Sequence, residues 1–288
     1  QNALLTQFIF QKLAEGVIII PYGLGRGFQA PFFRHRKVLR HIFYFVYKIE
    51  IFCIGMADKQ KITEETMERL LEGVRILDLT QALSGPYCCM HLADQGADVI
   101  KIEPPGGDMT RIWAPVVNDY SGYYAYFNRN KKGITLDLKS EEGSRVMMSL
   151  IDKADIFLSN VREPALERLG LDYDTLSAKY PRLIYAHFSG YGPKGPNAGE
   201  PGFDSTVFWL RGGMIADWQT EDARYPFEPT YAFGDTATAS SFFSAVLLAV
   251  IGREKTGKGT KVESSLYSSA IWCNGQGVLQ TQFEKKKL

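Results

Sequence analysis

Apolar and polar positions along this chain repeat in a regular order between residues 62 and 189. Short runs rich in apolar and β-branched residues are typical of strands buried in a parallel sheet. We predict such strands at Val74–Thr80, Asp98–Glu103, Gly133–Leu138, Ile156–Ser159 and Arg182–Ser189. Segments with helical spacing precede and separate these runs, and we predict helices at Ile62–Glu72, Tyr87–Asp94, Gly143–Ala154, Pro164–Arg168 and Tyr173–Tyr180.

The alternation of strands and helices predicts an α/β fold, in which helices flank both faces of a Rossmann-like parallel sheet. Pro86 suits the first turn of one helix, Ser140 can cap another, and Gly170 can end a third. Ligands of such sheets bind beyond the carboxyl ends of the strands. The loops of interest are therefore Gln81–Pro86, Glu103–Arg111, Asn160–Arg168 and Gly190–Gly202.

One carboxylate, Asp235, stands between a glycine and small residues in the segment TYAFGDTATAS, which runs from Thr230 to Ser240. The apolar run Phe242–Ile251 follows, so we predict a buried helix with Asp235 near its N-terminus. An Asp in that place most often caps the helix, because the first turn offers free N–H groups and favours an anion. The alternative is a carboxylate nucleophile that forms a covalent acyl intermediate. The local pattern leaves both readings open.

Composition narrows the class of protein. Of the 288 residues, 45% are apolar and 23% are charged, as in a soluble globular protein, and the net charge of +1 implies no nucleic-acid partner. The four cysteines, Cys53, Cys88, Cys89 and Cys273, show no metal-ligand spacing, and the four histidines form no metal motif. We therefore expect no metal site, a reducing compartment and a cytoplasmic location.

Residues 1–55 differ from the rest of the chain. They contain no methionine, whereas all seven methionines lie from Met56 onward. Their apolar run Ile42–Gly55 is interrupted by Lys48 and Glu50 and is too short to span a bilayer. We expect residues 1–55 to be an extension outside the folded protein; a membrane anchor or transit peptide is the alternative.

The segment Gly190–Gly195 matches the dinucleotide pattern GxGxxG. A dinucleotide site requires the pattern to open a helix, and Pro193 with the Gly, Pro and Asn residues that follow does not. We predict a turn there instead.

Five motifs occur in a fixed order and identify a family together. They are VRILDLTQALSGPYCCMHLADQGADVIKIEPPGGDMTR, NRNKKGITLDLKSEEG, SNVREPALERLGLDYDTL, SGYGPKGP and GDTATASSFFSAVLLAVIGREKTGKGTKVESSLYSSA. Between about Leu71 and Ala270 the chain closely resembles the class III CoA-transferases, which include formyl-CoA, carnitine-CoA, bile-acid-CoA and aryl-lactate-CoA transferases.

The resemblance implies an enzyme that moves CoA from an acyl-CoA donor to a carboxylic acid. Asp235 matches the aspartate that takes the acyl group as a mixed anhydride and then forms an aspartyl-CoA thioester. CoA is a substrate, and no permanently bound cofactor is implied. The positions that would contact CoA are Ala82, Leu83, Ser84, Leu136, Lys139, Asn160, Val161, Arg168 and Leu169.

For two of these positions, a role in binding CoA has a physical reason beyond the resemblance. The phosphates of CoA need cations, which Lys139 and Arg168 would supply, although a lone Lys or Arg is more often a solvated surface charge. Lys101 and Arg111 are weaker candidates, and Pro104 stands where some members have an Arg on the adenine side.

The resemblance also implies a domain organisation. Residues 56–270 would form the large domain, and residues 271–288 would begin the linker to a small second domain that this sequence lacks. Family members form interlocked homodimers, and a glycine-rich loop of the missing part shields the aspartyl intermediate. We therefore expect a C-terminally truncated chain.

Two other functions stay open. The related α-methylacyl-CoA racemases use a Gly-His-Asp segment that corresponds here to Gly202, Phe203 and Asp204, and a phenylalanine cannot move a proton. The segment PGFDSTVFWLRGG resembles the branch that acts on aryl- or hydroxyacyl-CoA; its plain interpretation is a helix start followed by a glycine turn. The remaining alternative is an inactive CoA-binding fragment.

Overall fold

The computed structural model describes residues 69–219, 224–225 and 231–284. The chain divides into two units, Gln1–Met67 and Glu68–Leu288, and the elements below all belong to the second unit. The expectation for residues 1–55 and most of the predicted helix Ile62–Glu72 lie outside the described residues, so the predicted domain boundaries stay predictions.

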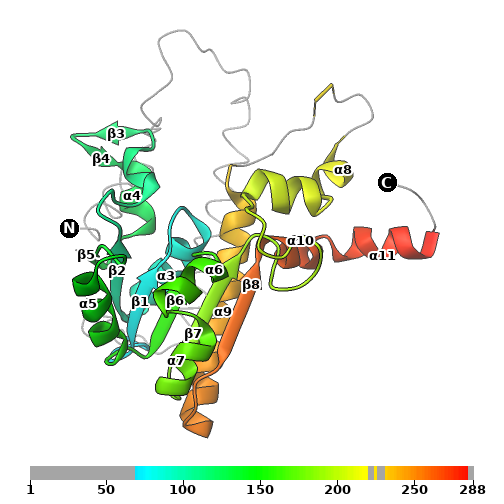
Figure 1. Ribbon diagram of the computed structural model, residues 1–288. Coiled ribbons are helices and arrows are strands. Elements are labelled where there is room, and N and C mark those ends of the chain that lie inside the picture. Colours follow the sequence, from blue (N-terminus) through cyan, green and yellow to red (C-terminus); the bar gives the residue numbers. More distant parts are fainter. Residues whose placement is uncertain (1–68, 220–223, 226–230, 285–288) are drawn as a thin grey trace, which may run out of the picture. The chain divides into compact units, whose positions relative to one another are not determined.

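A six-stranded sheet forms the centre of this unit (Figure 1). Its order is β5-β2-β1-β6-β7-β8, and every neighbouring pair is parallel, as the α/β prediction requires. The strands are β1 (Arg75–Leu79), β2 (Asp98–Glu103), β5 (Lys132–Thr135), β6 (Ile156–Ser159), β7 (Ile184–Ser189) and β8 (Lys261–Ser265).

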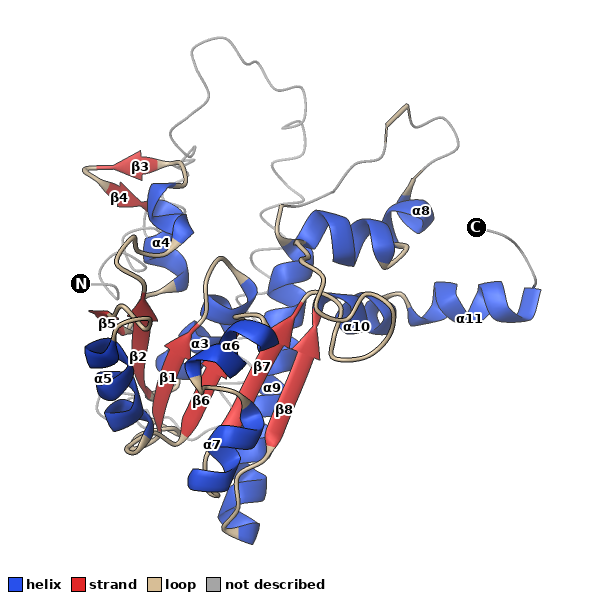
Figure 2. Ribbon diagram, in the orientation of Figure 1, coloured by secondary structure: helices blue, strands red, loops and turns tan. Residues whose placement is uncertain are grey.

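Helices cover both faces of the sheet (Figure 2). On one face lie α3 (Ser84–Asp94), α9 (Phe233–Thr256) and the π-helix η4 (Asp204–Arg211). On the other lie α5 (Glu141–Ile151), α6 (Glu163–Leu169) and α7 (Tyr173–Lys179). Because successive residues of a strand point to opposite faces, Ile76 of β1 enters the first core and Leu77 enters the second.

Local signals set the ends of these elements as predicted. The Ser140 side chain accepts a hydrogen bond of 3.0 Å from the Gly143 N–H and caps α5. Gly170 ends α6 with a φ of 66°, in the left-handed region that a glycine adopts readily. The segment Gly190–Gly195 forms bends and opens no helix, so the prediction of a turn is confirmed.

The predicted strand Gly133–Leu138 is too long at its end. β5 stops at Thr135, and Leu136 and Leu138 turn away to line a cleft instead. The pattern also misses β8 and several short elements: η3 (Met109–Ile112), β3 (Val116–Val117), β4 (Tyr120–Ser121), α4 (Gly122–Phe127), α8 (Met214–Trp218), α10 (Leu266–Cys273) and α11 (Gly275–Glu284).

The 24-residue helix α9 is long and apolar enough in composition to cross a membrane. Core helices of soluble proteins have the same composition, and α9 buries Phe242, Val246 and Ala249 against the sheet. This helix begins before the predicted run Phe242–Ile251 and carries Asp235 in its first turn.

Candidate active site

Asp235 is not the cap of α9. The N-cap residue is Ala232, whose φ of 56° is left-handed, and Asp235 follows as the third residue of the helix. Its side chain leaves the helix end and accepts a hydrogen bond from the Ser84 hydroxyl at the start of α3. The capping interpretation is therefore wrong, and the carboxylate has Ser84 as its partner instead.

A close approach of η4 fixes the residue before this carboxylate. A Cβ on Gly234 would lie 2.1 Å from Asp204 Oδ1 and 2.2 Å from the Phe208 ring. Only a glycine allows η4 and the first turn of α9 to pack this tightly. In the Gly-Asp pair, the glycine thus meets a packing requirement and the aspartate is the candidate reactive group.

The environment of Asp235 raises its pKa. Burial disfavours the charged form and raises the pKa from 3.8 to about 6, although the hydrogen bond from Ser84 acts in the opposite direction. The carboxyl is thus ionised at neutral pH but poorly solvated. A partly desolvated carboxylate near its pKa is a suitable nucleophile at that pH.

The loop Gln81–Leu83 connects β1 to α3 and is held by a side chain from a neighbouring strand end. Asn160 accepts from the Gln81 N–H at 3.0 Å and donates to the Gln81 carbonyl at 2.8 Å. Ala82 follows with a left-handed φ of 66°, and Leu83 packs against Phe127 and Ala232. Asn160 therefore fixes this loop, a role that the sequence did not suggest.

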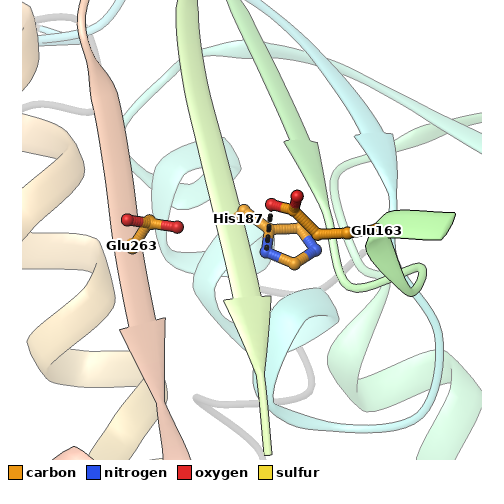
Figure 3. Close-up of side chains that lie close together, drawn as sticks. All are labelled: Glu163, His187 and Glu263. Carbon is orange, nitrogen blue, oxygen red and sulfur yellow. Dashed lines mark ion pairs between the residues drawn. The ribbon is translucent and has the colours of Figure 1, made fainter. Parts of the chain in front are cut away.

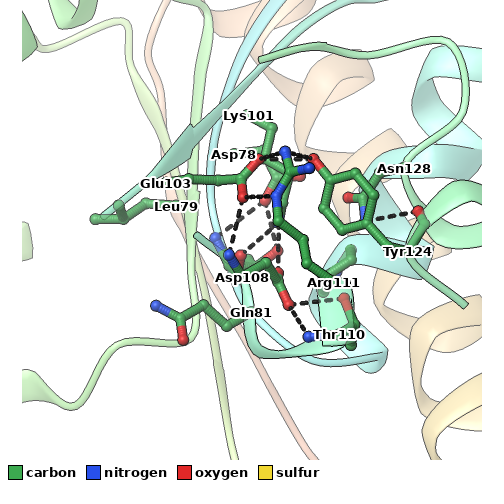
Figure 4. Close-up of polar contacts among 12 residues, drawn as sticks. Asp78, Leu79, Gln81, Lys101, Glu103, Asp108, Thr110, Arg111, Tyr124 and Asn128 are labelled. Atoms are coloured by element: carbon green, nitrogen blue, oxygen red, sulfur yellow. Dashed lines mark hydrogen bonds and ion pairs between the residues drawn. The ribbon is translucent and has the colours of Figure 1, made fainter. Parts of the chain in front are cut away.

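A buried network of charged side chains holds Thr80, the residue before the loop, in place (Figure 4). Lys101 Nζ donates to the Thr80 carbonyl at 2.8 Å and pairs with Asp108 at 2.9 Å. Asp78 accepts from the Thr80 N–H at 3.0 Å and pairs with Lys131 at 2.8 Å. Burial would raise the pKa of Asp78, but Lys131 and Lys101 lower it to about 2.

Both of the weaker CoA candidates are engaged in ion pairs. The Lys101 side chain is 1% exposed and enclosed by its partners. Arg111 binds Glu103 through two nitrogens, at 2.7 and 2.8 Å, and its guanidinium lies 3.9 Å from the centre of the Tyr124 ring. Burial opposes ionisation of Glu103, yet Arg111 and Tyr124 lower its pKa to about 2. Both cations are therefore held in ion pairs, Lys101 in the interior and Arg111, whose side chain is 47% exposed, at the surface.

A cleft of about 930 Å³ opens at the carboxyl edge of the sheet. Five of the predicted CoA positions line it: Leu136, Lys139, Val161, Arg168 and Leu169. Pro104 lines it as well, with Pro105 and Glu103. Ala82, Leu83, Ser84 and Asn160 are not part of its lining.

The cleft contains two accessible cations. Lys139 and Arg168 are exposed, and within the described part of the chain neither side chain is held by a carboxylate. Gln81 lines the cleft, while Ser84, three residues later, contacts Asp235. The loop thus runs from the cleft to the candidate nucleophile.

Comparison with known proteins agrees with this geometry. Residues 71–287 match the family model for CoA-transferase family III. The chain belongs to this family. It is 38% identical over 219 residues to (R)-2-hydroxy-4-methylpentanoate CoA-transferase of Clostridioides difficile, covering 74% of this chain and 55% of the relative.

Two further family members are similar to this chain. Cinnamoyl-CoA:phenyllactate CoA-transferase of Clostridium sporogenes is 38% identical over 226 residues, covering 76% of this chain and 54% of the relative. A CAIB/BAIF family protein from Brucella suis has a TM-score of 0.71 at 34% identity, covering 76% of this chain and 59% of that structure. The chain thus spans about half the length of the curated relatives that it matches.

A cluster of two glutamates and a histidine lies apart from the loop Gln81–Leu83 and from Asp235 (Figure 3). Glu163, His187 and Glu263 place possible metal-ligand atoms within 4.8 Å of one another. Lys261 Nζ lies 3.3 Å from Glu163 and 2.9 Å from Glu263, so one ammonium pairs with both carboxylates and offsets part of their charge. His187 Nε2 lies 2.9 Å from the Val161 carbonyl. The cluster therefore supports a wall of the cleft, and its residues are too far apart in the sequence for a motif to reveal it.

Proposed function

We propose that this family III member transfers CoA between an acyl-CoA and a carboxylic acid, with Asp235 as the nucleophile. The observation that carries the proposal is the place of Asp235, a partly buried carboxyl with a pKa of about 6 beside a loop that leads to a cationic cleft. The homodimer and the cytoplasmic location that the sequence suggests belong to the same proposal.

CoA would lie along the loop from the cleft to Asp235. Lys139 and Arg168 would bind its phosphates, because an exposed cation without an internal partner loses little by pairing with phosphate. Leu136, Val161 and Leu169 would contact the apolar surface of the nucleotide. The thioester would then approach Asp235 past Ala82 and Ser84.

The chemistry needs two exchanges at one carboxyl. Asp235 attacks the thioester carbonyl carbon, the C–S bond breaks, and CoA leaves as a thiolate, giving a mixed anhydride. The thiolate then attacks the carboxyl carbon of Asp235 and releases the donor acid. The acceptor acid reverses both steps, so the energy of the thioester is conserved without a metal or a net proton transfer.

Transfer fits this site better than racemisation. A racemase needs a proton carrier in the segment Gly202–Asp204, and Phe203, which is 64% exposed, has no group that can serve. The names of the relatives suggest 2-hydroxy acids and dicarboxylic acids as the first acceptors to assay.

Trapping at Asp235 tests the proposal. The chain is incubated with an acyl-CoA, treated with hydroxylamine and analysed by peptide mass spectrometry, where we expect modification at Asp235. Asp235→Ala should abolish the modification and leave CoA binding unchanged, because the carboxyl acts in covalent steps alone. Asp174→Ala, which removes an exposed carboxylate of α7, is the matched control. CoA binding without any modification would identify an inactive CoA-binding chain instead.

A further inference from the structure

The Ser84 hydroxyl has a position that CoA binding alone does not explain. Ser84 is the first residue of α3, its side chain is buried, and its hydroxyl points at Asp235 Oδ1 rather than into the cleft. The two residues are 151 positions apart, and the hydrogen bond joins the N-terminal turns of α3 and α9.

We propose that Ser84 is a catalytic residue that donates its hydrogen bond to the oxyanion formed on the carboxyl carbon of Asp235. This inference rests on the proposed acyl transfer to Asp235. Because Ser84 holds Oδ1, the second oxygen, Oδ2, is the one that attacks the acyl-CoA.

The atoms of the two steps place Ser84 at the developing charge. In the first step Oδ2 forms a bond to the acyl carbon and the CoA sulfur leaves with the bonding electrons. Oδ1 then becomes the carbonyl oxygen of the anhydride. In the second step the thiolate attacks the carboxyl carbon, negative charge develops on Oδ1, and the donor acid leaves with Oδ2. The Ser84 hydroxyl already points at Oδ1 and needs no reorganisation.

The loop supports Ser84 in this position. Asn160 fixes both backbone polar groups of Gln81, and Lys101 fixes the carbonyl of Thr80. A side chain on Gly85, the next residue, would lie 2.6 Å from the Thr80 side chain. The start of α3 is therefore packed closely against a loop that is itself held by hydrogen bonds, which limits the movement of the hydroxyl.

Rapid-quench mass spectrometry of the whole protein separates the two steps, because the first adds the acyl group and the second adds CoA. In Ser84→Ala we expect the CoA adduct to form about 10²-fold more slowly, the loss typical of one oxyanion donor. The acyl adduct should accumulate. Ser240→Ala removes the same hydroxyl from the exposed face of α9, where it bonds to its own helix, and should behave as the unmodified chain.

A second measurement does not depend on turnover. Loss of the Ser84 donor should raise the pKa of Asp235 further, so the ¹³C titration of its carboxyl should move to higher pH in Ser84→Ala but not in Ser240→Ala. If Ser84→Ala does not fold, Ser84→Cys, a weaker donor of similar shape, replaces it in both measurements.

The outcomes separate the inference from the function on which it rests. If the unmodified chain forms neither adduct at Asp235, the proposed function is wrong. If it forms both, and Ser84→Ala forms the CoA adduct at the same rate with the same Asp235 titration, the role of Ser84 is refuted while the function stands.

Discussion

At the scale of single residues, the ionised carboxyl that the proposed reaction needs at Asp235 lowers the stability of the fold. The carboxyl of Asp235 has a pKa of about 6 in the folded chain against an ordinary value of 3.8, because burial disfavours its charge. Its ionised form therefore destabilises the fold above pH 6, and this penalty disappears as the pH falls to 3.8.

Asp235→Asn should make the chain more stable. Because the substitution removes a partly desolvated charge, we expect a gain of about 1–2 kcal/mol in the free energy of unfolding at pH 7. Urea unfolding at pH 7 and at pH 4 measures the gain, which should shrink to near zero at the lower pH. Equal stabilisation at both values would contradict the assigned direction of the shift. Asp174→Asn, on the exposed surface of α7, is the control.

Gly234→Ala should damage both the fold and the site. Its Cβ would collide with Asp204 and the Phe208 ring, so we expect a loss of about 1–3 kcal/mol in thermal or urea unfolding, together with loss of acyl trapping. Gly252→Ala on the same helix has open space around its Cβ and should stabilise the chain by about 0.5–1 kcal/mol. If both variants lose stability equally, the close contacts around residue 234 do not cause the loss in Gly234→Ala.

At the scale of elements, the sequence predicts the four inner strands of the sheet, makes the edge strand β5 too long and misses the other edge strand, β8. β6 is buried at all four positions, so an apolar run marks it, whereas β8 lies at the end of the sheet and reads KVESS, in which four of the five residues are polar. The motif around Asp235 suggests this residue as the nucleophile, but the contact of Asp235 with Ser84 depends on how α3 and α9 pack. Lys101 and Arg111 resemble ligand-binding cations in the sequence because their acidic partners are revealed only by the fold.

Lys101→Met should show how much the loop before α3 depends on its buried ion pair. The substitution leaves Asp108 and Asp78 without one of their cations, and breaking a buried pair costs about 3–5 kcal/mol. Lys132→Met, on the neighbouring strand, breaks an ion pair with Asp98 at a lysine that is 74% exposed and should cost less than about 1 kcal/mol. Chemical unfolding of both variants provides the comparison, and equal losses would contradict the burial of Lys101.

At the scale of the whole molecule, several large apolar side chains of the described residues face solvent. Trp272 is 86% exposed and Phe283 is 82% exposed, with Leu279 of α11 at 53% and Leu248 of α9 at 69%. Where exposed apolar side chains form one contiguous patch, they usually mark a site of association.

We therefore expect this chain to associate in a concentration-dependent way. Trp272→Gln combined with Phe283→Ser should shift its sedimentation toward the monomer without changing urea unfolding, because both side chains lie outside the core. Lys258→Gln, at an exposed position after α9, is the control for a general change of surface. Unchanged sedimentation of the double variant would exclude α10 and α11 from the contact.

The residues of the site are widely separated along the chain, and this separation affects how fast the site forms during folding. Gln81 and Asn160 are 79 residues apart, and Ser84 and Asp235 are 151 apart. Contacts between such distant segments close large loops, and that makes them slow to form during folding. The proposed nucleophile, Asp235, therefore acquires its surroundings only after β1 has paired with β6 and α9 has docked, so before α9 docks its carboxyl would lack both the burial and the Ser84 hydrogen bond.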